Sequence, residues 1–186
     1  MSFGEYILQG FGILQIKPKA IREAAADLLA LNTGLAFIVI AGAAAALGSW
    51  TLPGLILFPL IFLVRALLHS AMVHFLATRG FGGQGTYGGF FRPMSLAYLL
   101  DWLMVVGLLI NVIPLLGPAM MILLGLTVTL WKLVVDTVII ETVYGLNRSR
   151  AIAVMGIAVA IFIAFFFLAS LFSGAAVLSS WLVTRP

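Results

Sequence analysis

The sequence predicts an all-α, polytopic membrane protein: a five-helix transmembrane bundle with an N-terminal amphipathic interfacial helix. Of its 186 residues, 63% are hydrophobic and only 9% are charged, whereas soluble domains average about 25% charged residues. A mean hydropathy of +1.23 excludes an ordinary soluble domain, and the length allows one compact membrane domain. Five stretches reach the roughly 20 apolar residues that a helix needs to cross a bilayer. We therefore expect the lipid bilayer to surround most of the chain.

Residues 1–32 form a predicted lead-in to the first span. Pro18 is suited to the first turn of a helix, and charged side chains would line one side of that helix. The opposite, apolar face would carry Ile21, Ala24, Ala25, Leu28 and Leu29. This pattern predicts a short amphipathic helix on the membrane surface, preceded by an apolar interfacial arm from Phe3 to Leu14. The alternative is a docking site for a cytosolic partner.

The transmembrane domain is predicted over residues 33–172 and a short tail over residues 173–186. Prolines fall near the proposed helix ends, where a missing N–H costs least. Pro59 lies inside the second span and predicts a kink or a late start there. The five predicted spans are Thr33–Trp50, Gly54–Thr78, Pro93–Pro114, Gly117–Tyr144 and Ala151–Leu171.

Basic residues are distributed unevenly among the predicted loops. The N-terminal segment and the loops after the second and fourth spans hold Lys17, Lys19, Arg22, Arg79, Arg92, Arg148 and Arg150, whereas the other side holds only Arg185. Cytoplasmic loops of membrane proteins carry the excess of Lys and Arg. We therefore predict a cytoplasmic N-terminus and an outside C-terminus, in a membrane that we expect to be a bacterial inner membrane.

Five ionisable residues lie inside the predicted spans: Arg65, His69, Asp101, Lys132 and Asp136. A charged side chain at the bilayer centre costs about 2.5–3.5 kcal/mol on insertion scales, so these groups must be paired, hydrated or used. Lys132 and Asp136 are four residues apart on one helix and are predicted to pair. Arg65 and His69 form a polar stripe on the second span, and Asp101 is its predicted cross-helix partner.

Two interpretations of this intramembrane polar cluster are open. In the first, the opposite charges neutralise each other and hold three helices in register. In the second, Asp101, Asp136 and His69 line a path for protons or ions; binding of a lipid head group or of another subunit is a third possibility. The equal number of acids and strong bases favours the structural interpretation.

The sequence contains no pattern that indicates a catalytic or cofactor-binding site. Cysteine is absent, and His69 and His74 are five residues apart, which places them on different sides of a helix. Ser70 and His74 are four apart, but no third group would orient the histidine. We therefore predict no enzyme activity, catalytic residue, metal site or cofactor. No dense basic cluster is present either, so we expect no binding to nucleic acid.

Several short motifs occur in a fixed order along the chain. The loop after the second span reads Gly82-Gly83-Gln84-Gly85-Thr86-Tyr87, the turn after the third reads Ile113-Pro114-Leu115-Leu116-Gly117, and the turn before the fifth reads Tyr144-Gly145-Leu146-Asn147-Arg148. Trp131 lies in the fourth span. In this order and spacing the chain resembles the Yip-domain family, the Ypt/Rab-interacting membrane proteins and their prokaryotic relatives, over roughly Pro18 to Phe172.

The resemblance implies five spans and a non-enzymatic role. Eukaryotic family members are adaptors for small GTPases and have a long cytosolic N-terminal region; the short lead-in here is more similar to the prokaryotic branch. We therefore expect a scaffold, an assembly factor or an accessory subunit of a membrane complex, working with other membrane subunits or as a homo-oligomer. The alternative is a small proton- or ion-conducting transporter or channel component that uses the intramembrane polar cluster.

Overall fold

A computed structural model describes residues 1–114 and 116–183, and this part is helical with no strand. Its α-helices are α1 (Phe3–Leu14), α2 (Pro18–Ala26), α3 (Ala30–Gly48), α4 (Gly54–Phe75), α5 (Tyr87–Leu96), α6 (Gly107–Ile110), α7 (Leu116–Tyr144) and α8 (Arg148–Val183). A π-helical turn, η1 (Leu76–Gly80), follows α4, and a 3₁₀ segment, η2 (Ala97–Val106), joins α5 to α6. Five stretches of the described chain are long and apolar enough to cross a membrane. The predicted all-α, multi-pass membrane architecture is confirmed.

The third span begins earlier than the sequence indicated. The Thr86 side chain accepts a hydrogen bond of 3.1 Å from the backbone N–H of Gly89 and caps α5 at its N-terminus, as expected for a threonine at this position. Arg92 and Pro93 therefore lie inside α5 and not in a loop. The Arg92 Nη1 donates to the Ala25 carbonyl at 2.6 Å, which ties α5 to the end of α2.

The last helix is longer than predicted. Instead of ending near Leu171, α8 is one helix of 36 residues that ends at Val183. Most of the predicted tail over residues 173–186 is therefore helical, and residues 184–186 lie outside the described part. A helix of this length extends about 54 Å, well beyond the roughly 30 Å hydrocarbon core of a bilayer.

The N-terminal helices dock onto the bundle. α2 ends at Ala26, so Leu28 and Leu29 lie beyond it and are 73% and 64% exposed. Ile21 and Ala24, expected to face lipid, are fully buried, and α2 contacts α5 and α7. The structure therefore does not confirm an interfacial amphipathic helix, because the apolar side of α2 faces protein.

Two hydrogen bonds hold α1 in place. The Tyr6 hydroxyl donates to Asp27 Oδ2 at 2.6 Å; this bond raises the pKa of Tyr6 to about 12 and lowers the pKa of Asp27. The Trp131 Nε1 donates to the Leu14 carbonyl at 3.1 Å and satisfies one of the free carbonyls at the end of α1. The N-terminal arm is thereby fastened both to α2 and to the fourth span.

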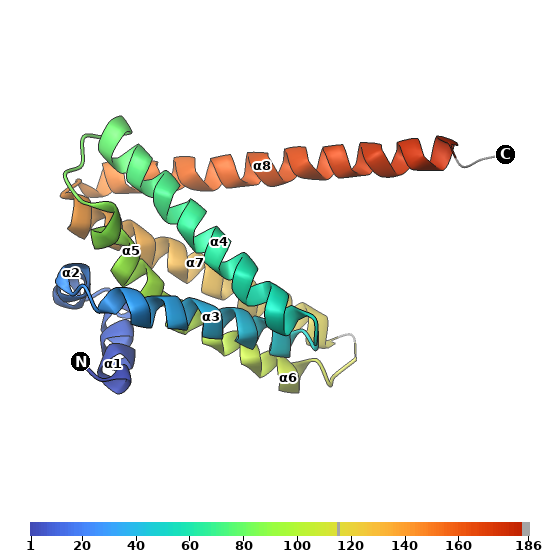
Figure 1. Cartoon of the computed structure of the whole chain (residues 1–186), viewed down its shortest axis with the longest axis horizontal. Coiled ribbons are helices and arrows are strands. Elements are labelled where there is room, and N and C mark those ends of the chain that lie inside the picture. The colour runs from blue at the N-terminus through green and yellow to red at the C-terminus, as the bar shows by residue number, and fades with distance from the viewer. Residues whose placement is uncertain (115, 184–186) are drawn as a thin grey trace.

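Small residues bring α3 close to its neighbours. A Cβ added at Gly42 would lie 2.5 Å from the Cα of Pro59 on α4, and one at Gly48 would overlap the Met104 carbonyl of η2. Close approach of this kind is how helices pack in membranes. Figure 1 shows α3, α4, η2–α6 and α7 side by side, whereas α8 meets them near its start and then diverges.

Candidate functional site

A cavity of about 570 Å³ lies inside the bundle and brings together all five intramembrane charged residues predicted from the sequence. Its volume falls in the range of about 300–1,000 Å³ that is typical of small-molecule sites. The lining residues are Ile61, Arg65 and His69 of α4, Met94, Tyr98 and Asp101 of the third span, Thr129, Lys132, Leu133 and Asp136 of α7, and Met155, Val159, Phe162 and Ile163 of α8. Spans two, three and four pack around the cluster, and α8 closes its fourth side.

The first ion pair crosses from α7 to the third span. Lys132 Nζ lies 2.6 Å from Asp101 Oδ2, and the two side chains are only 11% and 9% exposed. The same ammonium lies 3.3 Å from the centroid of the Tyr98 ring, close enough for a cation–π interaction. This lysine is held from two sides, and the pair locks α7 to η2.

The second pair crosses from α4 to α7. The His69 Nε2 lies 3.2 Å from Asp136 Oδ2, and the His69 ring packs near Phe162 of α8, with centroids 6.1 Å apart. The other carboxylate oxygen, Asp136 Oδ1, is buried without a hydrogen-bond partner in the described chain. A buried carboxylate oxygen left in this state is costly unless something donates to it.

Arg65 differs from the other four. It is exposed, and within residues 1–114 and 116–183 it makes no hydrogen bond or ion pair, although it lines the cavity. The cavity is thus open beside Arg65, which lies in a helix long and apolar enough to cross a membrane. It carries one unpaired cation and one unsatisfied carboxylate oxygen.

The predicted pairings were wrong, although all five residues line one cavity. Lys132 was expected to bond Asp136 on its own helix, and Asp101 was expected to face Arg65 and His69. Instead Lys132 bonds Asp101, and His69 bonds Asp136. Lys132 points toward the third span, where Tyr98 and Asp101, three residues apart on η2, both contact its ammonium.

The glycine-rich loop from Gly82 to Tyr87 is a turn packed against the neighbouring helices. The Gly83 N–H donates to the Ala77 carbonyl at 2.8 Å, and the Gln84 N–H donates to the Tyr144 carbonyl at 3.1 Å. A Cβ at Gly83 would lie 2.8 Å from the Tyr144 Cβ, and one at Gly85 would lie 2.6 Å from the Val143 carbonyl. Gly82 has a φ of 72°, which glycine adopts at little cost.

Ser70 and His74 have separate partners on the same helix. The Ser70 hydroxyl donates to the Tyr87 hydroxyl at 2.8 Å, and His74 Nδ1 lies 3.0 Å from the Tyr144 hydroxyl. These bonds tie α4 to the start of α5 and to the end of α7. No group of three His, Asp or Glu side chains in the described residues is placed to hold a metal ion.

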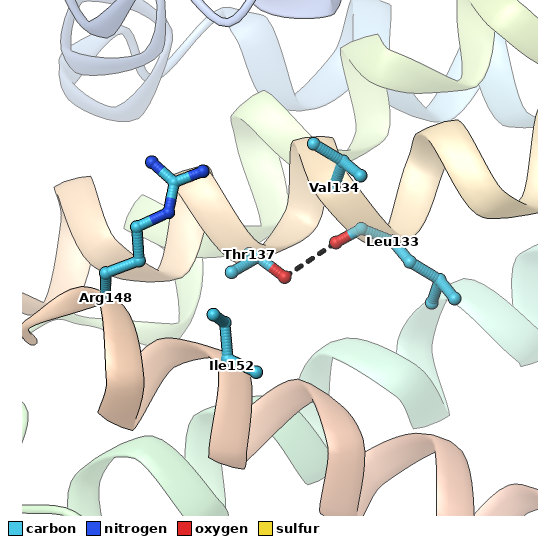
Figure 2. A pocket seen from close by; sticks show the side chains of 5 residues that line it. All are labelled: Leu133, Val134, Thr137, Arg148 and Ile152. Atoms are coloured by element: carbon cyan, nitrogen blue, oxygen red, sulfur yellow. Dashed lines mark hydrogen bonds between the residues drawn. The ribbon is translucent and has the colours of Figure 1, made fainter.

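The remaining motif residues form turns. Pro114 precedes α7, a Cβ at Gly117 would lie 2.8 Å from the Ile110 carbonyl, and Gly145 takes a φ of 66° just after α7, the usual role of a glycine that ends a helix. Arg148 begins α8 and lines a second cavity of about 220 Å³ (Figure 2). The Thr137 hydroxyl there already donates to the Leu133 carbonyl at 2.7 Å, so this mainly apolar hollow offers little chemistry.

Sequence reasoning missed the apolar part of the large cavity. The α8 residues Met155, Val159 and Phe162 carry no pattern that separates them from a lipid-facing surface. Tyr98 could have been predicted from the sequence, since it precedes Asp101 by three residues. Comparisons of the chain with protein-family models, with curated proteins and with solved structures gave no match.

Proposed function

We propose that this protein is a non-enzymatic, Yip-like membrane scaffold or accessory subunit that assembles as a homo-oligomer through α8. The observation that carries the proposal is an exposed stripe of small residues on α8: Gly156, Ala160 and Ala164, at intervals of four. A Cβ at Gly156 would meet nothing within 4 Å. Small residues at this spacing let two transmembrane helices approach closely, and the same patch on two copies gives a symmetric pair.

The rest of α8 is consistent with this role. The sequence carries no charge between Ala151 and Thr184, and Figure 1 shows α8 leaving the bundle after its first turns. Two other small residues are used for packing within the chain: a Cβ at Gly42 or at Gly107 would lie 2.5 Å from backbone atoms of a neighbouring helix. The α8 stripe is thus available to a second copy.

The chain contains no cysteine, so single-cysteine crosslinking tests this proposal without background. Ala160→Cys should give a disulfide-linked dimer in native membranes on mild oxidation. Leu60→Cys, at a 55% exposed position of α4, is the matched control and should stay monomeric. Gly156→Leu should abolish the Ala160→Cys crosslink, whereas Thr127→Leu on α7 should not. Equal crosslinking at both cysteines, or a monomer with every variant, contradicts the proposal.

For orientation we propose a cytoplasmic N-terminus and an outside C-terminus. Figure 1 supports this arrangement: α2, the loop after α4 and the turn between α7 and α8 gather at one end of the molecule. The seven basic residues counted above lie in or beside these segments. Reporters fused after Leu116 and after Asn147 should read outside and cytoplasmic, respectively; the reverse pattern rejects the proposal.

A second candidate function is proton or ion conduction through the charged cavity. The unpartnered Oδ1 of Asp136 favours it, because a conducting site keeps free acceptor atoms. The two ion pairs argue against it, because Asp101 and Asp136 each already have a basic partner. Wild-type protein in proteoliposomes should carry a proton or cation flux that Asp136→Asn removes; absence of flux in the wild type ends this candidate.

A further inference from the structure

We propose that the charged cavity binds a zwitterionic amphiphile whose ammonium group donates to Asp136 and whose anionic group faces Arg65, as in a phospholipid with a primary amine. This inference goes beyond the scaffold function and does not depend on it. It starts from the two groups that the fold leaves unsatisfied in one cavity: a buried carboxylate oxygen and a guanidinium without a partner in the described chain.

The two unsatisfied groups are spaced for one small dipolar head group. His69, which holds Asp136 at 3.2 Å, is four residues after Arg65 on α4. One helical turn, about 5–6 Å along the axis, therefore separates the cation from the level of the acid. A phosphate and a primary ammonium joined by two carbons span a distance of this order. Arg binds phosphate and carboxylate groups well because it presents several donors in a plane.

The remaining charges in the cavity do not suit a ligand that is purely anionic or purely cationic. Lys132 is neutralised by Asp101 at 2.6 Å, so within the described residues the cavity offers one unpaired cation, Arg65, and one unsatisfied carboxylate oxygen, Asp136 Oδ1. An anion would leave Asp136 Oδ1 unsatisfied, and a cation would leave Arg65 without a partner. A ligand that combines an anionic group with a hydrogen-bond donor satisfies both groups, and a primary ammonium is a strong donor to a carboxylate because it also carries the opposite charge.

The rest of the lining specifies an apolar body for the ligand. Opposite the polar residues, α8 contributes Met155, Val159 and Phe162, against which a free amino acid or a bare head group would pack poorly. The rim residues Ile61 and Ile163 are 48% and 64% exposed. Because α4 and α8 cross the membrane here, that rim faces hydrocarbon, and a ligand enters from the bilayer.

The test is lipid retention by the full chain in mild detergent, measured by native mass spectrometry. Three phospholipids with identical acyl chains are compared: phosphatidylethanolamine, phosphatidylcholine and phosphatidylglycerol. The first should bind about tenfold or more tightly than the others, because only its head group combines a hydrogen-bond donor for Asp136 with a positive charge. A quaternary ammonium cannot donate to Asp136, and a glycerol head carries no cation. Equal binding of all three overturns the proposal.

Variants locate the site. Arg65→Gln, which breaks no contact in the described structure, should lower phosphatidylethanolamine binding about tenfold, whereas the matched control Arg148→Gln, at the smaller cavity, should not. Asp136→Asn should bring phosphatidylethanolamine down to the level of phosphatidylcholine. If Asp136→Asn fails to fold, Val159→Trp serves in its place: it fills the apolar end and should remove binding while the charges stay intact. An Arg65→Gln protein that binds like wild type overturns the assignment.

Soluble phosphoethanolamine distinguishes a membrane lipid from a free zwitterion. It should compete with phosphatidylethanolamine only weakly, because it lacks the apolar body that packs against α8. Competition at equal concentration overturns the amphiphile. Gly156→Leu should retain wild-type lipid binding, so failure of the homo-oligomer and failure of the lipid site are separable results.

Discussion

The third span and α4 line the same cavity from opposite sides, yet they are packed very differently. In the most apolar stretch of each, 50% of the residues of the third span are buried, against 17% in α4. The third span is surrounded by α3, α7 and the docked α1 and α2. α4 contacts α3 and α5, and it meets α8 near its C-terminal end.

The third span and α4 are held in place in different ways. On the third span, specific polar contacts fix the position: the Trp102 Nε1 donates to the Phe37 carbonyl at 3.1 Å, and Asp101 bonds Lys132. On α4, Arg65 has no hydrogen bond or ion pair within the described residues, and Asp136 Oδ1 of α7 also lacks a partner there. The third span, which these contacts fix, determines the register of the helices. The less buried α4 borders the cavity and its opening.

The largest loss of stability should come from breaking the ion pair between Lys132 and Asp101 of the third span. Lys132→Leu leaves Asp101 as an uncompensated buried charge, which should cost about 3–5 kcal/mol of unfolding free energy. Arg65→Leu removes a cation of the same cavity that has no partner, so it should leave stability unchanged or raised. Denaturant unfolding in detergent micelles measures both. Equal losses would mean that the two sides are not held differently.

The next effect compares two glycines in membrane helices. Gly42→Ala would force its Cβ against Pro59 backbone atoms at 2.5 Å and should cost about 1–3 kcal/mol through overpacking. Gly156→Ala meets open space and should be neutral or stabilising by up to about 1 kcal/mol, since alanine is the better helix former. Thermal unfolding of the two variants in the same micelles is the measurement. A loss with Gly156→Ala alone would reverse the comparison.

A smaller effect should follow from loosening the docked N-terminus. Tyr6→Phe removes the hydrogen bond to Asp27 and should cost about 1 kcal/mol. The Asp27 pKa is lowered by folding, so its contribution is present above the unfolded value of about 3.9 and is lost as pH falls through the folded pKa.

The pKa of Tyr6 is raised by folding to about 12. Its contribution is therefore complete below the unfolded value of about 10 and is lost as pH rises toward the folded pKa. An alkaline titration of tyrosinate absorbance, compared with the Tyr6→Phe variant, should show one tyrosine titrating near this value. Ionisation of Tyr6 near pH 10 would mean that α1 is not docked.

The smallest effect should be at the surface of α2. Lys19 and Glu23 lie 3.9 Å apart with side chains 85% and 57% exposed, and such pairs contribute about 0–1 kcal/mol. Glu23→Gln should therefore change the unfolding midpoint very little at any salt concentration. A clear loss of stability would indicate that this side of α2 is covered in the membrane-bound protein.

Much of the fold was predictable because its signals are local. Hydropathy and proline positions located all five spans, since crossing a bilayer requires a long apolar helix. The helix starts were less certain: the cap at Thr86, which opens the third span, was hidden in a glycine-rich stretch. The five charged residues were predicted as one group because charged side chains inside membrane spans pair with one another, whereas the apolar residues of the cavity carry no such signal.

Composition and hydropathy were enough to predict the class of this protein, the number of spans and the presence of five ionisable residues inside them. The packing of the helices determines which charge meets which, because side chains four residues apart can pair but need not, and Lys132 meets Asp101 on another helix. Packing also makes α2 face protein, lets α8 diverge and leaves Arg65 without a partner in the described residues. These features depend on how helices pack against one another, and hydropathy, which is a property of single residues, does not contain them.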